Sequence, residues 1–179
     1  MKFLTLALPD VRLVESEPRS DSRGSFARVF CADEFARHGL ASAFVQANVS
    51  INHRRGIVRG LHWQRPPHAE VKLVRCTRGA IYDVVVDIRP DSPTHLRWVG
   101  VELSAENGRM MYVPEGFAHG YQTLTDLADV HYMVSCAYAP ASEAGMRFDD
   151  PALAIAWPLE PGGISDKDAA WPLLEAAKP

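Results

Sequence analysis

The sequence predicts a mainly β-structured protein, an antiparallel jelly-roll barrel with a few short helices. The first observation is a long series of short runs rich in Val, Ile, Leu, Tyr and Trp, separated by turn residues. The second is that most of these runs follow one another without a helix, which favours an antiparallel barrel over a parallel α/β sheet. The third is size: 179 residues, 47% of them hydrophobic, can bury one substantial core, so we expect a single domain over residues 1–179.

The first predicted elements are two short strands and a helix. Val11–Glu15 and Ser25–Cys31 have strand character and flank a polar turn that contains a glycine. Ala32–Gly39 has a helical pattern and ends at its glycine. The further predicted strands are Phe44–Ser50, Ile57–Trp63, Val71–Cys76, Ala80–Arg89, Leu96–Leu103, Arg109–Val113, Gly120–Leu124 and Val130–Tyr138.

The last segment, from about residue 151, differs in composition from the strands before it. It is rich in proline and alanine and has little strand character. We therefore expect it to wrap the barrel and to end in a short helix at Leu173–Ala177.

Charge and cysteine content limit the partners and the compartment. The formal net charge of −3 gives no electrostatic reason to expect nucleic acid or an anionic membrane as a partner. Cys31, Cys76 and Cys136 form no Cys-x-x-Cys pair, and their odd number favours reduced thiols in the cytoplasm. The apolar N-terminal run is interrupted from Asp10 onward, well before a transmembrane length.

The stretch 56–75 carries the two side chains of greatest chemical interest. His62, in RGLHWQ, lies on an extended run where its imidazole can face a barrel interior, although a lone histidine in such a run is more often a core residue. Lys72 stands between Val71 and Leu73, and lysines are rarely buried unless they are paired or used. Strand alternation turns Lys72 away from these two neighbours, toward either solvent or the barrel interior, where it would stabilise a developing oxyanion.

A second histidine has the Pro-x-Gly-x-x-His spacing seen in cupin barrels, which often bind a metal. It is His119, in PEGFAHG. The usual cupin metal set also needs a His-x-His pair and a carboxylate on an earlier strand, whereas His62-Trp63-Gln64 offers a single imidazole. We therefore expect no metal here, and a hydrogen-bonding, phosphate-facing or structural role for His119.

Several longer motifs resemble one known family. RGLHWQ, EVKLVRCTRGAIYDVVVDIR, GVELSAENGRMMYVPEGFAHGYQTL, DDPALAIAWP and SDKDAAWP are similar, in this order and spacing, to the dTDP-4-dehydrorhamnose 3,5-epimerases. The resemblance extends from DSRGSFARVF, near Asp21, to Pro172. It implies a cupin-type jelly roll without cofactor or metal, usually a homodimer, that acts on a nucleotide-linked 4-keto-6-deoxy sugar.

The resemblance also assigns roles to individual residues. His62 matches the proton-abstracting histidine of the family, and Asp168 matches the carboxylate that orients it. Lys72 matches the lysine beside the enolate oxygen, and Tyr132 matches the tyrosine that returns a proton from the other face. The positions that match the substrate-binding residues are Arg23, Gln46, Asn48, Arg59, His119, Tyr138, Glu143 and Lys167.

The chemistry of a 4-keto sugar suits these residue types. The hydrogens on C3 and C5 are acidic because removal of either one leaves an enolate with its charge on the C4 oxygen. A neutral histidine is a suitable base near neutral pH, and a buried aspartate fixes its tautomer. A cation at the enolate oxygen adds on the order of 3 kcal/mol, and inversion needs a new proton from the opposite face.

The chain departs from the family pattern at Arg28. The family commonly has a glutamate there, which reaches the nucleotide from the partner subunit. A carboxylate accepts from the N3–H of thymine, whereas an arginine favours an acceptor such as N3 of cytosine. We therefore leave the nucleotide open between dTDP and CDP, with the hypothesis that it is not dTDP. We also expect N-terminal strands shared in a homodimer to bring Arg23 or Arg28 to the partner's site.

The sequence leaves other functions open. A C3-only epimerase or a ketoisomerase on a related dTDP- or CDP-linked sugar would use the same base and enolate. A metal-dependent cupin enzyme is disfavoured by the missing His-x-His pair. A non-catalytic sugar-nucleotide-binding cupin would not need the complete set of His62, Asp168, Lys72 and Tyr132.

Overall fold

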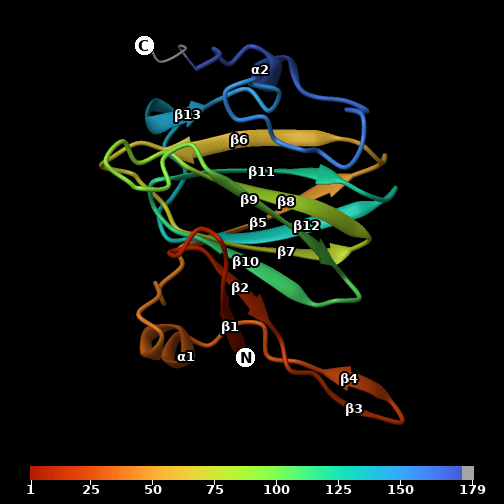
Figure 1. Ribbon diagram of the computed structural model, residues 1–179. Coiled ribbons are helices and arrows are strands. Elements are labelled where there is room, and N and C mark those ends of the chain that lie inside the picture. The colour runs from red at the N-terminus through yellow and green to blue at the C-terminus, as the bar shows by residue number, and fades with distance from the viewer. Residues whose placement is uncertain (175–179) are drawn as a thin grey trace.

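The computed structural model describes residues 1–174, which form two facing antiparallel sheets (Figure 1). The six-stranded sheet has the order β1 (Lys2–Thr5), β2 (Arg12–Glu15), β10 (Arg109–Val113), β7 (Lys72–Arg78), β12 (Ala128–Val134), β5 (Gln46–Asn52). The five-stranded sheet has the order β13 (Glu143–Gly145), β6 (Val58–Gln64), β11 (Phe117–Thr123), β8 (Ala80–Asp87), β9 (Trp98–Ser104). This arrangement agrees with the predicted jelly roll.

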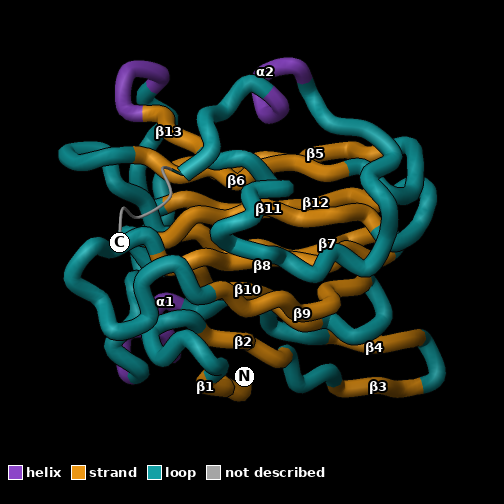
Figure 2. The backbone as a smooth tube through the Cα atoms, turned by 45° about the horizontal axis from the view of Figure 1, so that its top comes forward, coloured by secondary structure: helices purple, strands orange, loops and turns teal. Residues whose placement is uncertain are grey.

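A two-stranded ribbon, two short helices and a 3₁₀ turn lie outside these sheets. β3 (Arg19–Asp21) and β4 (Gly24–Phe26) form a two-stranded ribbon that extends away from the barrel (Figures 1 and 2). The helix α1 (Ala32–Arg37) lies under the six-stranded sheet, and α2 (Asp166–Ala169) lies near the five-stranded sheet on the opposite side of the barrel (Figure 1). A 3₁₀ turn spans Pro140–Ser142.

Strand alternation explains how one strand serves two cores. In β8, Ile81 and Val85 belong to the core between the sheets, whereas Val84 and Val86 belong to the core on the outer face of the five-stranded sheet. Successive strand residues point to opposite faces, so this strand is buried on both sides. The apolar run AIYDVVVD therefore marks a central strand.

The outer face of the six-stranded sheet is covered over part of its width. Phe35 of α1 is fully buried there against Leu73 and Met110. Phe30 and Phe44, from the segments that flank α1, pack into the same cluster. The predicted helix is confirmed, with its last turn closed by a backbone bond from Gly39 to Ala36.

The outer face of the five-stranded sheet is covered by the segment that begins at residue 151. Leu153 and Trp157 pack against Leu61, Val84 and Val86. This segment is the blue chain that passes over β6 in Figure 1. It also carries α2, and it thereby brings a C-terminal helix to the rim of the barrel.

Some predicted elements are wrong in extent. The expected strand Ser25–Cys31 ends at Phe26, because the following residues Val29 and Phe30 turn to pack around Phe35 instead of pairing with a strand. The short strand β13 and the single-turn helix α2 lack a periodic pattern long enough to recognise. Of the helix expected at Leu173–Ala177, residues 173–174 are not helical and the rest lies outside the described residues.

Among residues 1–174, no helix combines the length and the apolar character needed to cross a bilayer.

Candidate active site

One end of the barrel interior holds a polar cavity lined by both sheets. It has a volume of about 310 Å³ and is lined by Ser50, Arg59, His62, Lys72, His119, Gly120, Tyr121, Tyr132, Ser165, Lys167 and Asp168. An adjoining recess of about 350 Å³ shares His62, Lys72 and Tyr132 with it. The recess adds Gln46, Asn48, Trp63, Gln64, Glu70, Val134, Tyr138 and Glu143.

A histidine–aspartate pair lies in the wall formed by β6 and α2. Nε2 of His62 is 2.6 Å from Oδ1 of Asp168, and Oδ2 of Asp168 accepts from the backbone N–H of Gly60 at 3.3 Å. Ser165 caps α2 by accepting from the backbone N–H of Asp168, which holds the helix in place. Nδ1 of His62 has no hydrogen-bond partner within residues 1–174, so this nitrogen can accept a proton from a ligand.

The environment of Asp168 favours its ionised form. Burial would raise the pKa of this carboxyl, but the hydrogen bond and charge of His62, with the bonds from Gly60 and Ser165, outweigh burial and lower the pKa. A carboxylate held ionised beside an imidazole fixes the tautomer and stabilises the protonated ring. The pair is therefore built to make His62 a base.

An extra residue in β6 turns both Arg59 and His62 toward the cavity. In the pairing of β11 with β6, His119 lies opposite His62 and Tyr121 lies opposite Arg59. The two positions are two residues apart on β11 but three residues apart on β6. This shift is a β-bulge. Regular alternation would place Arg59 and His62 on opposite faces, so the bulge is what lets both line the same cavity.

Lys72 and Tyr132 come from the opposite sheet. Lys72 faces the cavity from β7 while Val71 and Leu73 pack into the outer cluster, which confirms the predicted alternation. Its Nζ lies 3.2 Å from Oε1 of Glu70 and 3.4 Å from the backbone oxygen of His62.

Tyr132 faces the same cavity from the neighbouring strand β12. Burial, and after it the charge of Glu70, raises the pKa of Tyr132 above its ordinary value. The hydroxyl therefore keeps its proton well into the alkaline range and is suited to donate it.

A second histidine–aspartate pair adjoins the first. Nε2 of His119 lies 2.8 Å from Oδ1 of Asp83, which is fully buried on β8. His119 is the direct strand partner of His62. We did not predict Asp83, although an acidic residue within the apolar run AIYDVVVD is a signal that it has an inward partner.

The rim of the recess is tied together by polar side chains. Oε1 of Glu143 accepts from Lys167, and its Oε2 accepts from the hydroxyl of Tyr138 at 3.0 Å. Burial would raise the pKa of Glu143, but these two bonds outweigh it and lower the pKa. On the facing strand β5, Gln46 donates to Asn48 at 3.0 Å.

Strand β5 carries a signal that sequence reasoning missed. Its inward positions are all polar, while its outward positions Ala47, Val49 and Ile51 are apolar and exposed. Ser50 accepts from Tyr121 at 2.9 Å, and Asn52 accepts from Nε of Arg59 at 2.8 Å. An inverted pattern of this kind, polar toward the barrel interior, identifies a strand that lines a polar site.

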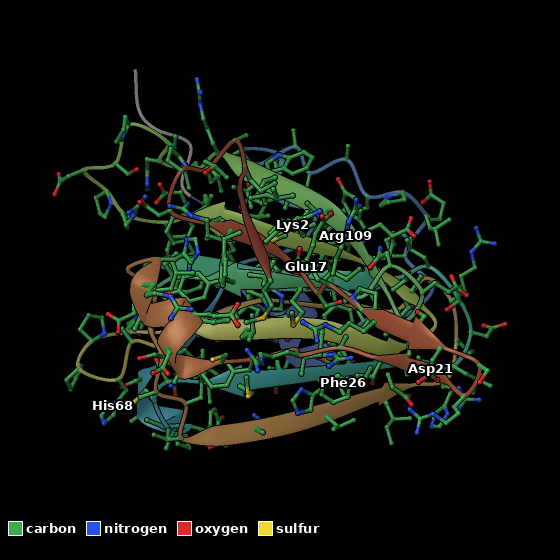
Figure 3. The ribbon with its side chains drawn as sticks, turned by 90° about the horizontal axis from the view of Figure 1, so that it is seen from below. Lys2, Glu17, Asp21, Phe26, His68 and Arg109 are labelled. Carbon is green, nitrogen blue, oxygen red and sulfur yellow. The ribbon has the colours of Figure 1, made fainter. Side chains whose placement is uncertain are left out.

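Two predicted residues lie away from the cavity of their own chain. Arg23 lies in the turn of the β3–β4 ribbon, and Arg28 lies in the segment after it; Asp21, at the start of this turn, is labelled toward one side of the molecule in Figure 3. Arg23 pairs with Asp21 at 2.6 Å, and Arg28 pairs with Glu34 at 2.8 Å. The other eleven predicted site residues line the cavity or its recess.

The donor set differs from that of a metal centre. Within the described residues, no three His, Cys, Asp or Glu side chains converge as metal ligands. The two imidazoles at the cavity each pair with a carboxylate instead.

Comparison with known proteins points to one family. A family model described as dTDP-4-dehydrorhamnose 3,5-epimerase matches residues 5–176. The chain is 44% identical to the enzyme of that name from Salmonella typhimurium, over 99% of this chain and 97% of the relative. It is 38% identical to a dTDP-4-dehydrorhamnose 3-epimerase from Streptomyces niveus, over 99% of this chain and 86% of that protein.

Solved structures agree with the sequence comparison. The Bacillus anthracis dTDP-4-dehydrorhamnose 3,5-epimerase, crystallised with TDP and pyrophosphate, superposes with a TM-score of 0.94 at 42% identity, over 97% of this chain and 99% of that one. The Legionella pneumophila enzyme in complex with dTDP-4-keto-L-rhamnose superposes with a TM-score of 0.92 at 40% identity, over 99% and 94% of the two chains. With a matching fold, a matching family model and relatives of this similarity along almost its whole length, the chain belongs to the dTDP-4-dehydrorhamnose 3,5-epimerase family.

Proposed function

We propose that the chain is an epimerase that inverts C3 and C5 of a nucleotide-linked 4-dehydro-6-deoxyhexose. The reaction would be of the type that converts dTDP-4-dehydro-6-deoxyglucose to dTDP-4-dehydro-L-rhamnose. The observation that carries the proposal is that His62 and Tyr132 line one cavity from opposite sheets, with Lys72 beside them. The family of the chain and the names of its relatives support the substrate class.

The proposed steps move protons and one electron pair. His62 takes the proton from the carbon beside the ketone, and Asp168 stabilises the imidazolium that forms. The electron pair of the broken C–H bond moves to the C4 oxygen, where Lys72 stabilises the enolate. Tyr132 then protonates the carbon from the opposite face, and exchange with solvent restores both residues.

The same groups would serve C3 and C5 in turn, since both carbons flank the ketone. Each step is a proton transfer, so the proposed reaction needs no electron acceptor. A reaction without cofactor or metal remains a prediction from the resemblance. Metal analysis of protein purified without added metal, together with activity in the presence of a chelator, is its test.

The decisive experiment is NMR of the reaction in deuterated water. We expect deuterium at both C3 and C5 of the product, with inversion at each carbon. The absence of turnover with any nucleotide-linked 4-keto-6-deoxy sugar would reject an epimerase and leave a sugar-nucleotide-binding protein.

A C3-only epimerase is the second candidate, favoured by the similarity to the Streptomyces niveus 3-epimerase. It would use the same base, cation and acid, so the described geometry supports both reactions. Deuterium at C3 alone in the experiment above would favour this candidate and reject double epimerisation.

The nucleotide is a separate proposal. Arg28 carries a positive charge where the family commonly has a carboxylate, so we retain the hypothesis of a CDP-linked substrate. Its pairing with Glu34 at 2.8 Å leaves the side chain 60% exposed and able to meet a ligand. We expect tighter binding of CDP than of dTDP, and Arg28→Glu should reverse the order; a preference of the unaltered protein for dTDP would end the hypothesis.

We propose a homodimer in which Arg23 and Arg28 of one chain reach the cavity of the other chain. The β3–β4 ribbon projects from the barrel, and Phe26, the last residue of β4 at the base of the ribbon, is 76% exposed. Strand β5 is an edge of the six-stranded sheet and presents Val49 and Ile51 to the outside. Exposed apolar side chains on an unpaired edge strand suit association with a second copy.

The location of the protein in the cytoplasm remains a prediction from the sequence.

A further inference from the structure

A buried carboxylate that the proposed reaction does not use lies against Lys72. Glu70 precedes β7, and its side chain is only 10% exposed. Oε1 of Glu70 is 3.2 Å from Nζ of Lys72, whose side chain is 12% exposed. A carboxylate and an ammonium are costly to remove from water unless each has a partner, so each of these charges depends on the other.

The second oxygen of Glu70 is also held. Oε2 accepts from Nε2 of Gln64 at 3.1 Å. Gln64 is buried at the end of β6, where its amide also donates to the backbone oxygen of His68 at 3.0 Å and accepts from the backbone N–H of Ala139 at 2.6 Å. Because the amide is bound at both ends, it holds Glu70 in one orientation.

The ion pair faces the reacting groups. Glu70 and Lys72 line the recess together with His62 and Tyr132. The charge of Glu70 also acts on Tyr132, where it adds to the effect of burial in raising the pKa, against the opposite effect of Arg59. Glu70 therefore influences both the cation and the acid of the proposed reaction.

We propose that Glu70 is a positioning residue: held by Gln64, its carboxylate fixes the Lys72 ammonium beside His62 and Tyr132, where it meets the negative charge that develops on the substrate. The inference rests on the proposed function, because it assigns Lys72 to the enolate oxygen. A cation that is already in place needs no reorganisation as the charge forms, and this is the source of its catalytic effect.

The test is Glu70→Gln, which retains the size of the side chain and removes its charge. We expect kcat to fall by about tenfold, because small misplacements of a catalytic group are costly, while KM changes by less than about twofold. Glu70→Asp, which restores the charge, should recover part of the loss. An unchanged kcat in Glu70→Gln would overturn the proposal.

A matched control is available in the same sheet. Glu15 on β2 pairs with Arg109 on β10 at 3.1 Å, and neither residue lines the cavity or its recess. Glu15→Gln should leave kcat and KM unchanged. An equal loss of kcat in this control would mean that any lost ion pair impairs the enzyme, and would overturn a specific role for Glu70.

A second measurement does not depend on activity. Thermal unfolding of Glu70→Gln, Lys72→Met and the double variant tests whether the two residues are coupled. We expect the double variant to lose less in Tm than the sum of the single losses, since each single variant leaves one buried charge unpaired. Additive losses would overturn the proposal. If the coupling is found but the unaltered protein turns over no 4-keto sugar, the proposed function fails, and the catalytic role of Glu70 fails with it.

Discussion

At the scale of single residues, the clearest test of the proposed base is His62. His62→Ala should lower kcat by roughly 10²–10⁴-fold, the usual contribution of a well-placed general base. The Tm should also fall, because the variant leaves the Asp168 carboxylate, whose side chain is 6% exposed, without its imidazole partner, so turnover is compared at a temperature where both proteins are folded. Turnover by wild-type and variant protein at equal concentration measures the effect.

His53→Ala is the control for His62, since His53 is exposed on the loop before β6. It should retain full activity. Near-normal turnover in His62→Ala would contradict the proposed mechanism.

Tyr132 should show a different defect, because it acts from the other wall of the cavity. In Tyr132→Phe, His62 can still remove a proton and return one to the same face. We therefore expect deuterium to enter the substrate from solvent with retained configuration, while inversion is lost. NMR of recovered substrate measures both events.

Tyr138→Phe is the matched comparison, since Tyr138 lines the recess but not the main cavity. It should still invert the substrate. Inversion at the wild-type rate by Tyr132→Phe would exclude Tyr132 as the acid.

At the scale of elements, the close approach of β6 and β11 depends on Gly60. A Cβ at this position would lie 2.6 Å from Cα of Gly120, and φ is +113°. Both facts exclude larger residues unless the backbone moves, so Gly60→Ala should destabilise the protein by about 3 kcal/mol. It should also lower activity, because the bulge orients Arg59 and His62. Urea unfolding and turnover measure the two effects.

Gly39→Ala separates strain from crowding. Gly39 also has a positive φ, +69°, but a Cβ there would meet nothing within 4 Å. Gly39→Ala should therefore lower the free energy of unfolding by only about 1–2 kcal/mol and leave activity normal. An equally small loss for Gly60→Ala would show that the strands can separate without harm.

The last residue of β8, Asp87, carries a buried carboxylate that links stability to pH. Asp87 is fully buried and accepts from Arg89, Ser92 and Thr94. Burial would raise the pKa of Asp87, but these bonds outweigh it and hold the pKa well below its ordinary value. Because the folded-state pKa is lowered, the ionised group stabilises the fold fully above the unfolded-state pKa of about 3.9. This contribution is lost as the pH falls toward the folded-state value.

The prediction concerns the slope of stability with pH. Asp87→Asn should lower the free energy of unfolding at pH 7 by about 3 kcal/mol, because it leaves Arg89 without its buried partner. Between pH 4 and 2.5 the variant should lose less stability than wild type. Asp91→Asn, an exposed change on the loop after β8, should match wild type. Equal slopes for Asp87→Asn and wild type would contradict the linkage.

At the scale of the whole molecule, association is expected to complete the site. Ile51→Asp places a charge on the exposed face of edge strand β5, where Ile51 is 59% exposed. We expect the unaltered protein to have twice the chain mass of 19.8 kDa in light scattering, and the variant to approach the monomer mass. Activity should decrease when the dimer is lost, because Arg23 and Arg28 would no longer reach a partner's cavity.

The control for association lies on the other sheet. Glu102→Lys changes an exposed residue on β9, the edge of the five-stranded sheet, and should leave the mass unchanged. A monomer for the unaltered protein would reject the homodimer.

Local pattern and residue chemistry were enough to predict much of the molecule. The strand-rich class, the helix from Ala32 and the placement of Lys72 on the strand face opposite Val71 and Leu73 follow from alternation and turn residues, which are properties of short segments. That this face is the barrel interior was decided by the fold. The resemblance of longer motifs then indicated the family, and eleven of the thirteen predicted site residues meet at one cavity and its recess.

The remainder depended on contacts between distant segments. His62 and Asp168 are 106 residues apart, and their contact requires the C-terminal segment to fold back over the five-stranded sheet. The pairing of His119 with Asp83 depends on β11 lying beside β8. The bulge that lets Arg59 join His62 appears only when β6 is paired with β11.

The sequence by itself therefore determined which side chains are available for chemistry and on which face of each strand most of them lie, because both are local properties. The tertiary structure decided which of them line the same cavity and which carboxylate pairs with which histidine. It also decided that Glu70, held by a hydrogen bond from Gln64, pairs with Lys72. These relations arise from strand order and register, which are set by packing between residues far apart in the chain.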